Sequence, residues 1–342
     1  MKITIGILAY NEAVTIPRIL HSLFQQSLFQ DNNSEIIEVI IVPNGCTDNT
    51  VQVAKNVLHS TQFPWQVCEV EEAGKSNAWN LFIHQFSASD TDFFFLMDAD
   101  ITLYAHDTLE KMVDVLVQNP EYWVSLDRLI KDVELKENQN LLEKLSIAVS
   151  KSSSAQLYIC GQLYCARASV LRNIWMPAGL PVEDGFLTQM VIRENFTIKN
   201  PTFEKRIVRV NEASHVFEAY TNAIELINHE VRVVVGIVIN IFLTYYFNSR
   251  CNEQLTAGTL IAQMNQENHF WLDDFVKNTV VKNSWWVIPT SLVFRRYRSL
   301  QNYSLWKAFL RIPIATLAFI VDLSVFIQAN SKLHRKTVTN YW

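Results

Sequence analysis

The chain has 342 residues, of which 49% are hydrophobic and 18% charged, and its formal net charge is −5. With only eight Gly and nine Pro, this composition excludes a disordered or collagen-like chain and predicts roughly two domains. The five cysteines are odd in number and lack a C-x-x-C spacing, which argues against a disulfide framework or a zinc site. Because the chain begins on a strand pattern and not on a signal peptide, we expect a cytoplasmic location.

The first third of the chain alternates between strand and helix patterns. Apolar runs predict strands over residues 3–9, 36–42 and 65–70 and a fourth that begins at Phe93. Helical spacing follows them over residues 14–26, 47–57, 77–86 and 107–118. This alternation predicts an α/β, Rossmann-like fold, in which a mostly parallel sheet is flanked by helices and joined by right-handed crossovers. The polar turns after the strands should therefore meet at one edge of the sheet, where such sheets bind ligands.

The stretch that follows is less regular. We predict helices over residues 138–150, 168–173 and 185–194, and strands over 162–166 and within 198–210. From residue 222 onward the chain becomes more apolar. We therefore divide it into a catalytic domain, residues 1–221, and a helical C-terminal region, residues 222–342.

Two long apolar runs mark the C-terminal region. Residues 231–247 are interrupted by Arg232 and Asn240, and residues 308–329 by Arg311 and Asp322. Neither run is a clean spanning segment of about 20 uncharged residues. A buried helix, a helix in the membrane interface and a re-entrant helix all stay open.

The C-terminal region is also basic. After Asp274 the only acidic residue is Asp322, against ten lysines and arginines. Basic residues flank the second apolar run, and several Trp and Tyr lie around it, which predicts an anionic membrane surface as partner. The long apolar run between the basic clusters argues against nucleic acid, and an oligomer interface or a covering subdomain is the alternative. We therefore expect the protein at, or anchored in, the inner face of a membrane.

The strand that begins at Phe93 ends on Asp98-Ala99-Asp100. Side chains two residues apart on an extended chain point to the same side, so both carboxylates should project together at the ligand-binding edge. Hard carboxylate oxygens suit Mg²⁺ or Mn²⁺. The alternative is an ordinary strand-ending turn, in which Asp is common.

Two further turns carry candidate chemistry. Lys75 follows Gly74 at a helix start, where an ammonium group and backbone amides can meet a diphosphate; a solvated lysine is the alternative. Glu183 and Asp184 precede the helix at 185–194. By position alone, they are acids that can cap the helix or fill its first turn.

Five motifs, in this order, resemble those of the family 2 glycosyltransferases, which are inverting, nucleotide-sugar-dependent enzymes of GT-A fold. They are Ala9-Tyr10-Asn11-Glu12, Asn44-Gly45-Cys46-Thr47-Asp48-Asn49-Thr50, Gly74-Lys75-Ser76-Asn77-Ala78-Trp79-Asn80, Asp98-Ala99-Asp100 and Glu183-Asp184. The resemblance covers roughly residues 3–215. It implies a metal-dependent transfer of a sugar from a nucleoside-diphosphate sugar to an acceptor with a free hydroxyl.

The resemblance also implies roles for single residues. It implies that the donor is bound by Ala9, Tyr10, Glu12, Asn44, Asp48, Gly74, Lys75, Asp98 and Ala99. Asn44 stands where the family usually has an Asp that contacts the nucleobase. Asp100 would bind the metal, and Asp184, with Glu183 beside it, would be the general base. His215 is a candidate third metal ligand, with a packed or capping histidine as the alternative.

The Q-x-x-R-W motif of members that synthesise polymers does not occur, and His229-Glu230-Val231-Arg232 lies in a comparable place. We therefore expect transfer of one sugar per acceptor, which would be a lipid or a lipid-linked glycan if the C-terminal region meets a membrane. Two other interpretations stay open. One is a non-catalytic nucleotide-sugar-binding partner subunit on the same fold. The other is a nucleotidyltransferase, which the Glu183-Asp184 pair disfavours.

Overall fold

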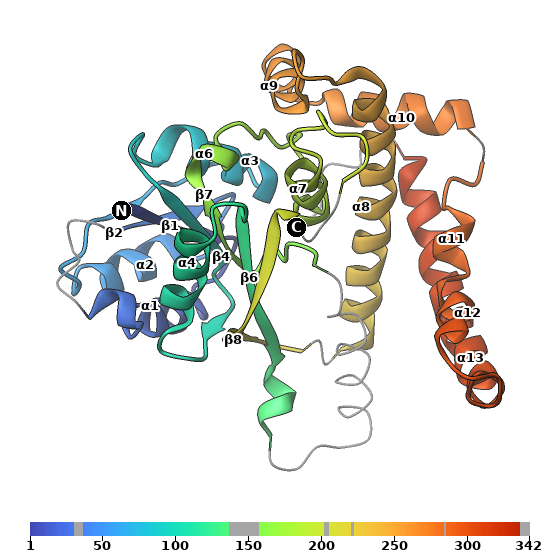
Figure 1. Ribbon diagram of the computed structural model, residues 1–342, viewed down its shortest axis with the longest axis horizontal. Helices are drawn as coiled ribbons and strands as arrows, with labels where there is room; N and C mark the ends of the chain where they lie inside the picture. Colours follow the sequence, from blue (N-terminus) through green and yellow to red (C-terminus); the bar gives the residue numbers. More distant parts are fainter. Residues whose placement is uncertain (31–36, 137–156, 202–204, 220–221, 284, 336–342) are drawn as a thin grey trace.

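The computed structural model describes residues 1–30, 37–136, 157–201, 205–219, 222–283 and 285–335 (Figure 1). The helix predicted over residues 138–150 lies outside these ranges. The predicted α/β fold is confirmed: a curled sheet is flanked by helices and followed by a helical C-terminal region.

In the described part of the chain, eight strands form one sheet in the order β3-β2-β1-β4-β7-β6-β8-β5. These are β1 (Ile3–Ala9), β2 (Ile37–Pro43), β3 (Trp65–Val67), β4 (Phe93–Asp98), β5 (Thr102–Leu103), β6 (Val124–Lys131), β7 (Leu163–Arg167) and β8 (Ile207–Phe217). β1 pairs in parallel with β2 and β4, and β2 with β3, so this half is parallel as predicted. The other half is mixed, because β7 is antiparallel to both β4 and β6.

Helices cover both faces of the sheet. The side chains of β1 alternate between the two faces, so each set contacts a different group of helices. Ile3, Ile5 and Ile7 pack with one set of helices: α1 (Ile16–Phe24), α2 (Thr50–Leu58) and α4 (Thr108–Gln118). Leu8 points to the opposite face, where the helices are α3 (Lys75–Leu81), its π-helical continuation η2 (Phe82–Phe86), α6 (Ala168–Leu171) and α7 (Glu183–Ile192). Two 3₁₀ turns, η1 (Ser27–Phe29) and η3 (Asp132–Leu135), lie between these elements.

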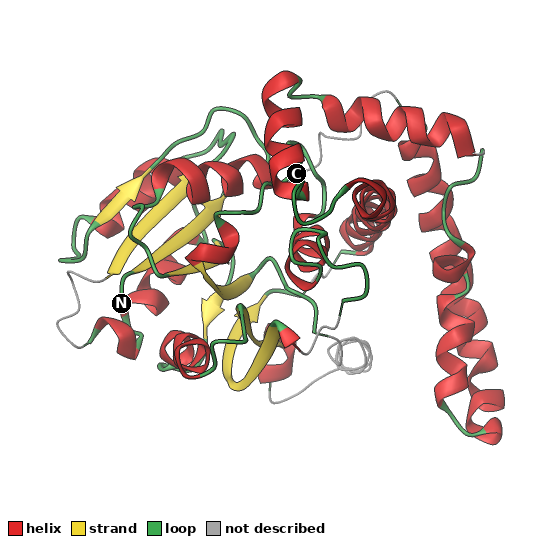
Figure 2. Ribbon diagram, turned by 45° about the horizontal axis from the view of Figure 1, so that its top comes forward, coloured by secondary structure: helices red, strands yellow, loops and turns green. Residues whose placement is uncertain are grey.

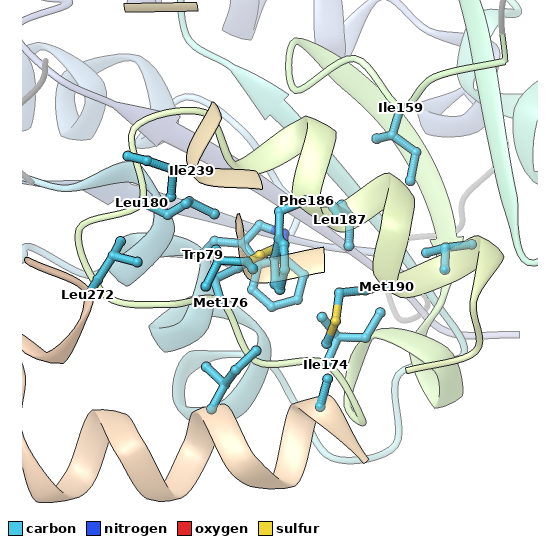
Figure 3. Close-up of a cluster of buried hydrophobic side chains, with 14 of the residues drawn as sticks. Trp79, Ile159, Ile174, Met176, Leu180, Phe186, Leu187, Met190, Ile239 and Leu272 are labelled. Carbon is cyan, nitrogen blue, oxygen red and sulfur yellow. The ribbon is translucent and has the colours of Figure 1, made fainter. Parts of the chain in front are cut away.

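The C-terminal helices extend the second core. They are α8 (Ala223–Arg250), α9 (Ala257–Glu267), α10 (Trp271–Asn283), α11 (Thr290–Val293), α12 (Arg295–Arg298), the turn η5 (Ser299–Asn302) and α13 (Leu305–Leu333). Figure 3 shows Trp79 of α3, Phe186 of α7 and Ile239 of α8 in one buried cluster. The boundary predicted at residue 221 falls just before α8, yet α8 shares the core of the sheet domain. The division into domains therefore stays a prediction.

Among the described residues, two helices are long and apolar enough to cross a membrane. In residues 224–250, 44% of the apolar window is buried inside the protein, which marks α8 as partly a core helix. In residues 306–333 the buried share is only 17%, and α13 lies on the far side of α8 from the sheet (Figure 1 and Figure 2). The two apolar runs therefore differ in kind, which their composition alone does not reveal.

Candidate active site

A cavity of about 1350 Å³ lies between the carboxyl edge of the parallel strands, the start of α7 and one side of α8. Nine predicted site residues line it: Tyr10, Glu12, Gly74, Lys75, Asp98, Ala99, Asp100, Glu183 and Asp184. They come from the ends of β1 and β4 and from the starts of α3 and α7, as expected for the ligand-binding edge of such a sheet. The cavity has room for a nucleotide sugar together with part of an acceptor.

Lys75 joins the two sides of the cavity. Its Nζ lies 2.6 Å from Asp98 Oδ1 at the end of β4 and 3.0 Å from Glu183 Oε1 at the start of α7. It also donates a hydrogen bond of 3.2 Å to the carbonyl oxygen of Gly161. Burial opposes the charge, but the two carboxylates hold the pKa of Lys75 well above its ordinary value. Lys75 is therefore protonated and ties β4 to α7.

Asp184 faces the cavity from the first turn of α7. Its Oδ1 accepts a hydrogen bond of 2.6 Å from the N–H of Gly185, and its Oδ2 accepts one of 3.4 Å from the N–H of Gly161. Burial, reinforced by the charge of Glu183, raises the pKa of Asp184 to about 6. Because Glu183 is paired with Lys75, Asp184 is the member of the pair suited to take a proton from a bound molecule near neutral pH.

The carboxylates at the end of β4 repel one another and their neighbours. Burial raises the pKa of Asp98, and the charge of Asp100 adds to this while Lys75 opposes it. Burial also raises the pKa of Glu12, and Asp100 again contributes. The Asp100 side chain is exposed to the cavity, and within the described ranges no cation pairs with it. This is an uncompensated negative site.

That site fits a divalent cation only together with a ligand. In the described part of the chain, no group of three or more His, Cys, Asp and Glu side chains could hold a metal ion by itself. Mg²⁺, however, is commonly held by one or two carboxylates and completed by substrate phosphates and water. Asp100, with Asp98 behind it, offers this kind of incomplete oxygen site.

The sequence was compared with models of known protein families. Residues 4–166 match the family model described as glycosyl transferase family 2. The chain therefore carries a family 2 glycosyltransferase domain. The matched range includes Lys75, Asp98 and Asp100. No curated protein matches the chain by sequence.

Two solved structures are similar to this chain. A mannosyltransferase from Pyrobaculum calidifontis, in complex with GDP-Man and Mn²⁺, is 17% identical with a TM-score of 0.57; the match covers 97% of this chain and 86% of that one. Glucosyl-3-phosphoglycerate synthase from Mycobacterium tuberculosis, in complex with Mn²⁺, UDP and phosphoglyceric acid, is 18% identical with a TM-score of 0.49. That match covers 71% of this chain and 78% of the synthase. The first match supports a shared fold over almost the whole chain, including the C-terminal helices.

The glycosyltransferase cavity has a wall that sequence reasoning missed, namely α8. Its lining residues recur at helical spacing from Glu225 to Asn248. A Cβ atom on Gly236 would lie 2.3 Å from Val182, so the absence of a side chain lets α8 pack directly against the turn before Asp184. On the same side of α8, Arg232 lines the cavity, and its Nε is buried without a hydrogen-bond partner in the described part of the chain. The signals in the sequence were the polar residues that interrupt the apolar run and the stretch His229-Glu230-Val231-Arg232.

Asn44 lies behind the cavity wall rather than in it. It is fully buried, its Nδ2 donates to the carbonyl oxygens of Ala9 at 3.0 Å and Val42 at 3.4 Å, and its Oδ1 accepts from the N–H of Gly74 at 3.1 Å. Because backbone groups occupy its amide, the predicted contact of Asn44 with a nucleobase does not fit this arrangement. Ala9 is likewise buried and outside the lining.

Asp48 is also outside the cavity lining. Its carboxylate accepts hydrogen bonds from the N–H groups of Ala13, at 3.1 Å, and Thr50, at 3.0 Å. These bonds hold the turn after β1 against the start of α2. Asp48 therefore shapes the wall near Glu12 and does not line the cavity, unlike the donor-binding role that the resemblance implied for it.

His215 is buried inside the sheet, on β8. Its Nδ1 lies 2.7 Å from Asp127 Oδ2, and its Nε2 lies 3.3 Å from Gln162 Oε1. Both ring nitrogens thus have protein partners, and His215 does not line the cavity. The packed histidine, which was the alternative to a metal ligand, describes this position.

Proposed function

We propose that this protein is a metal-dependent inverting glycosyltransferase that moves one sugar from a nucleoside-diphosphate sugar to an acceptor hydroxyl. The observation that carries the proposal is that Asp98, Asp100 and Asp184 line one cavity, with Lys75 between the two sides. The family 2 domain over residues 4–166 supports the reaction class. The Mn²⁺ and GDP-Man in the similarly folded mannosyltransferase support the cofactor and the type of donor.

The position of each residue in the cavity indicates its role in the proposed reaction. Asp100 and Asp98 would hold Mg²⁺ or Mn²⁺, which when bound supplies Lewis-acid stabilisation of a departing diphosphate. Lys75, between the two sides, adds a fixed positive charge to the cavity. Asp184, from α7, accepts the proton of the acceptor hydroxyl as that oxygen attacks the anomeric carbon. In an inverting displacement the attacking and leaving groups are on opposite faces of the sugar. This geometry is consistent with Asp98 and Asp100 after β4 on one wall of the cavity and Asp184 of α7 on the other.

A thermal-shift screen of nucleotide sugars with and without Mn²⁺ tests this proposal. Ligands that bind only the folded state stabilise it by mass action, so a donor should raise the melting temperature only when the metal is present. Release of the nucleoside diphosphate from that donor should then follow. Binding without any release, to water or to an added acceptor, would instead identify a non-catalytic nucleotide-sugar-binding subunit.

We also propose that the acceptor is a lipid or a lipid-linked glycan, reached at an anionic membrane surface on the cytoplasmic side. The exposed apolar residues of α13 and the basic C-terminal region support this proposal. Fractionation of cells that express the full chain provides the test. The protein should sediment with membranes at low salt and be released in part at high salt; recovery only in the soluble fraction at both salt concentrations would contradict the proposal.

A further inference from the structure

The outward face of α13 carries a continuous row of exposed apolar side chains. This apolar stripe has about one large residue per turn, with 57–72% of each exposed: Trp306, Leu310, Ile314, Leu317 and Val321. The C-terminal half of α13 packs in the core through Val325, Phe326 and Ala329, whereas most of residues 306–321 is exposed. A contiguous exposed patch of this kind on a folded protein marks an interaction surface.

The length of the apolar stripe does not match a bilayer crossing. It extends over residues 306–321, which is about 23 Å at the helical rise of about 1.5 Å per residue. The hydrocarbon core of a bilayer is about 30 Å thick. Beyond Val321 the exposed side of α13 is mostly polar: up to Leu333 it carries Ser324, Gln328 and Ser331, and Ile327 is its one large apolar residue.

A charged cluster at mid-helix also opposes a crossing. Asp322, near the middle of α13, accepts hydrogen bonds from Arg295 and Arg296 of α12, at 2.9–3.2 Å. Arg295 also lies 3.4 Å from Glu230 of α8. If α13 crossed a membrane, this cluster and the adjoining side of α8 would lie at the depth of the acyl chains, where charged groups are costly.

The surroundings of the stripe favour an anionic surface. Arg298, Lys307 and Arg311 are exposed near its N-terminal end, and Arg335 is exposed at the other end of α13. Asp322, the only acidic residue after Asp274, is already paired with arginines. A second copy of the chain fits less well, because a two-fold contact through the stripe would bring like charges together.

We propose that α13 lies flat in the interface of an anionic lipid bilayer, with the apolar stripe immersed and the flanking cations at the headgroups. This inference rests on the proposed membrane association and adds its geometry. The helix docks through one face and does not cross the bilayer, as in amphipathic interfacial helices. The catalytic cavity then stays in water on the other side of α8.

Flotation of the full-length protein with sealed vesicles tests the docking face. Vesicles of phosphatidylcholine with and without phosphatidylglycerol are the probes. The double variant Ile314→Gln/Leu317→Gln should bind anionic vesicles at least about tenfold more weakly than the wild type. The matched control Val281→Gln, which changes an exposed apolar residue of α10, should bind like the wild type. Equal binding by the double variant would overturn the stripe as the docking face.

Labelling from one side tests the flat orientation separately. Ser304→Cys and Ser331→Cys place thiols before and near the end of α13, and an impermeant maleimide is added outside vesicles that already carry the protein. Both sites should be modified, as read by peptide mass spectrometry. Modification of only one site would show a crossing helix and overturn the flat orientation, although membrane association would survive. No flotation with either lipid mixture, or a dimer that the double variant converts to a monomer, would overturn the proposal.

Discussion

Asp184→Asn should separate catalysis from stability. An amide cannot accept the acceptor's proton, so the transfer rate should fall by about 10²- to 10⁴-fold, the usual contribution of a general base. Stability should not fall with it. The pKa of Asp184 is raised from 3.8 to about 6 in the folded protein, so its ionised form opposes folding above pH 6, and this cost disappears as the pH falls below about 4.

The size of this effect follows from the pKa shift. At pH 7 the ionised Asp184 costs at most about 3 kcal/mol of folding free energy. The asparagine removes that cost but weakens one of the hydrogen bonds from the backbone N–H groups of Gly161 and Gly185, which offsets about 1–2 kcal/mol. We therefore expect the free energy of unfolding of the variant to be unchanged or up to about 2 kcal/mol higher.

The pH dependence provides a second readout of the same group. With a pKa of about 6, the active carboxylate accounts for about nine tenths of the wild-type protein at pH 7 and about one tenth at pH 5. The wild-type rate should therefore fall about tenfold over that interval, and more steeply if Asp98 must also be ionised. Nucleoside diphosphate release, measured with the best donor from the thermal-shift screen, follows the rate, and urea unfolding follows the stability. A variant that keeps more than a tenth of the rate, or that loses several kcal/mol of stability, would refute this role.

Three further variants probe the rest of the site. Lys75→Met leaves Asp98 and Glu183 facing each other without their cation. Urea unfolding should therefore show a free energy of unfolding about 3 kcal/mol lower than that of the wild type. An unchanged free energy of unfolding would contradict the ion-pair account. Asp100→Asn removes an exposed carboxylate, so stability should change by less than about 0.5 kcal/mol while the metal-dependent thermal shift caused by the donor disappears; an undiminished shift would exclude Asp100 from the metal site. Asn44→Asp would turn a carboxylate toward the carbonyl oxygens of Ala9 and Val42 and should cost about 2–4 kcal/mol; tighter donor binding without that cost would show instead that residue 44 contacts the donor.

The parallel half of the sheet and its ligand edge could be predicted because the information is local. Buried strands such as Phe93–Asp98 are apolar runs that end in polar turns, and parallel strands bring those turns together whatever the rest of the chain does. The cluster of Lys75, Asp98, Asp100 and Asp184 followed from that rule and from the family motifs.

The remainder depends on long-range pairing that the local pattern does not encode. β6 was not predicted. The strand expected within residues 198–210 is β8, which lies at Ile207–Phe217. The bounds of β8 are set by its pairing with β6 and β5, which are distant in the sequence. His215 was a candidate ligand by sequence position, but pairing within the sheet buries it against Asp127. The two apolar C-terminal runs looked alike in composition, and only packing shows that α8 is a cavity wall while α13 presents an exposed stripe.

Anomalous diffraction from crystals grown with Mn²⁺ and the nucleoside diphosphate of the best donor tests the central claim most directly. Our account predicts a manganese peak within coordination distance of the Asp100 carboxylate and of the diphosphate, with the Asp184 carboxylate across the same cavity. A diphosphate bound without metal, or a manganese ion held away from Asp98 and Asp100, would contradict it.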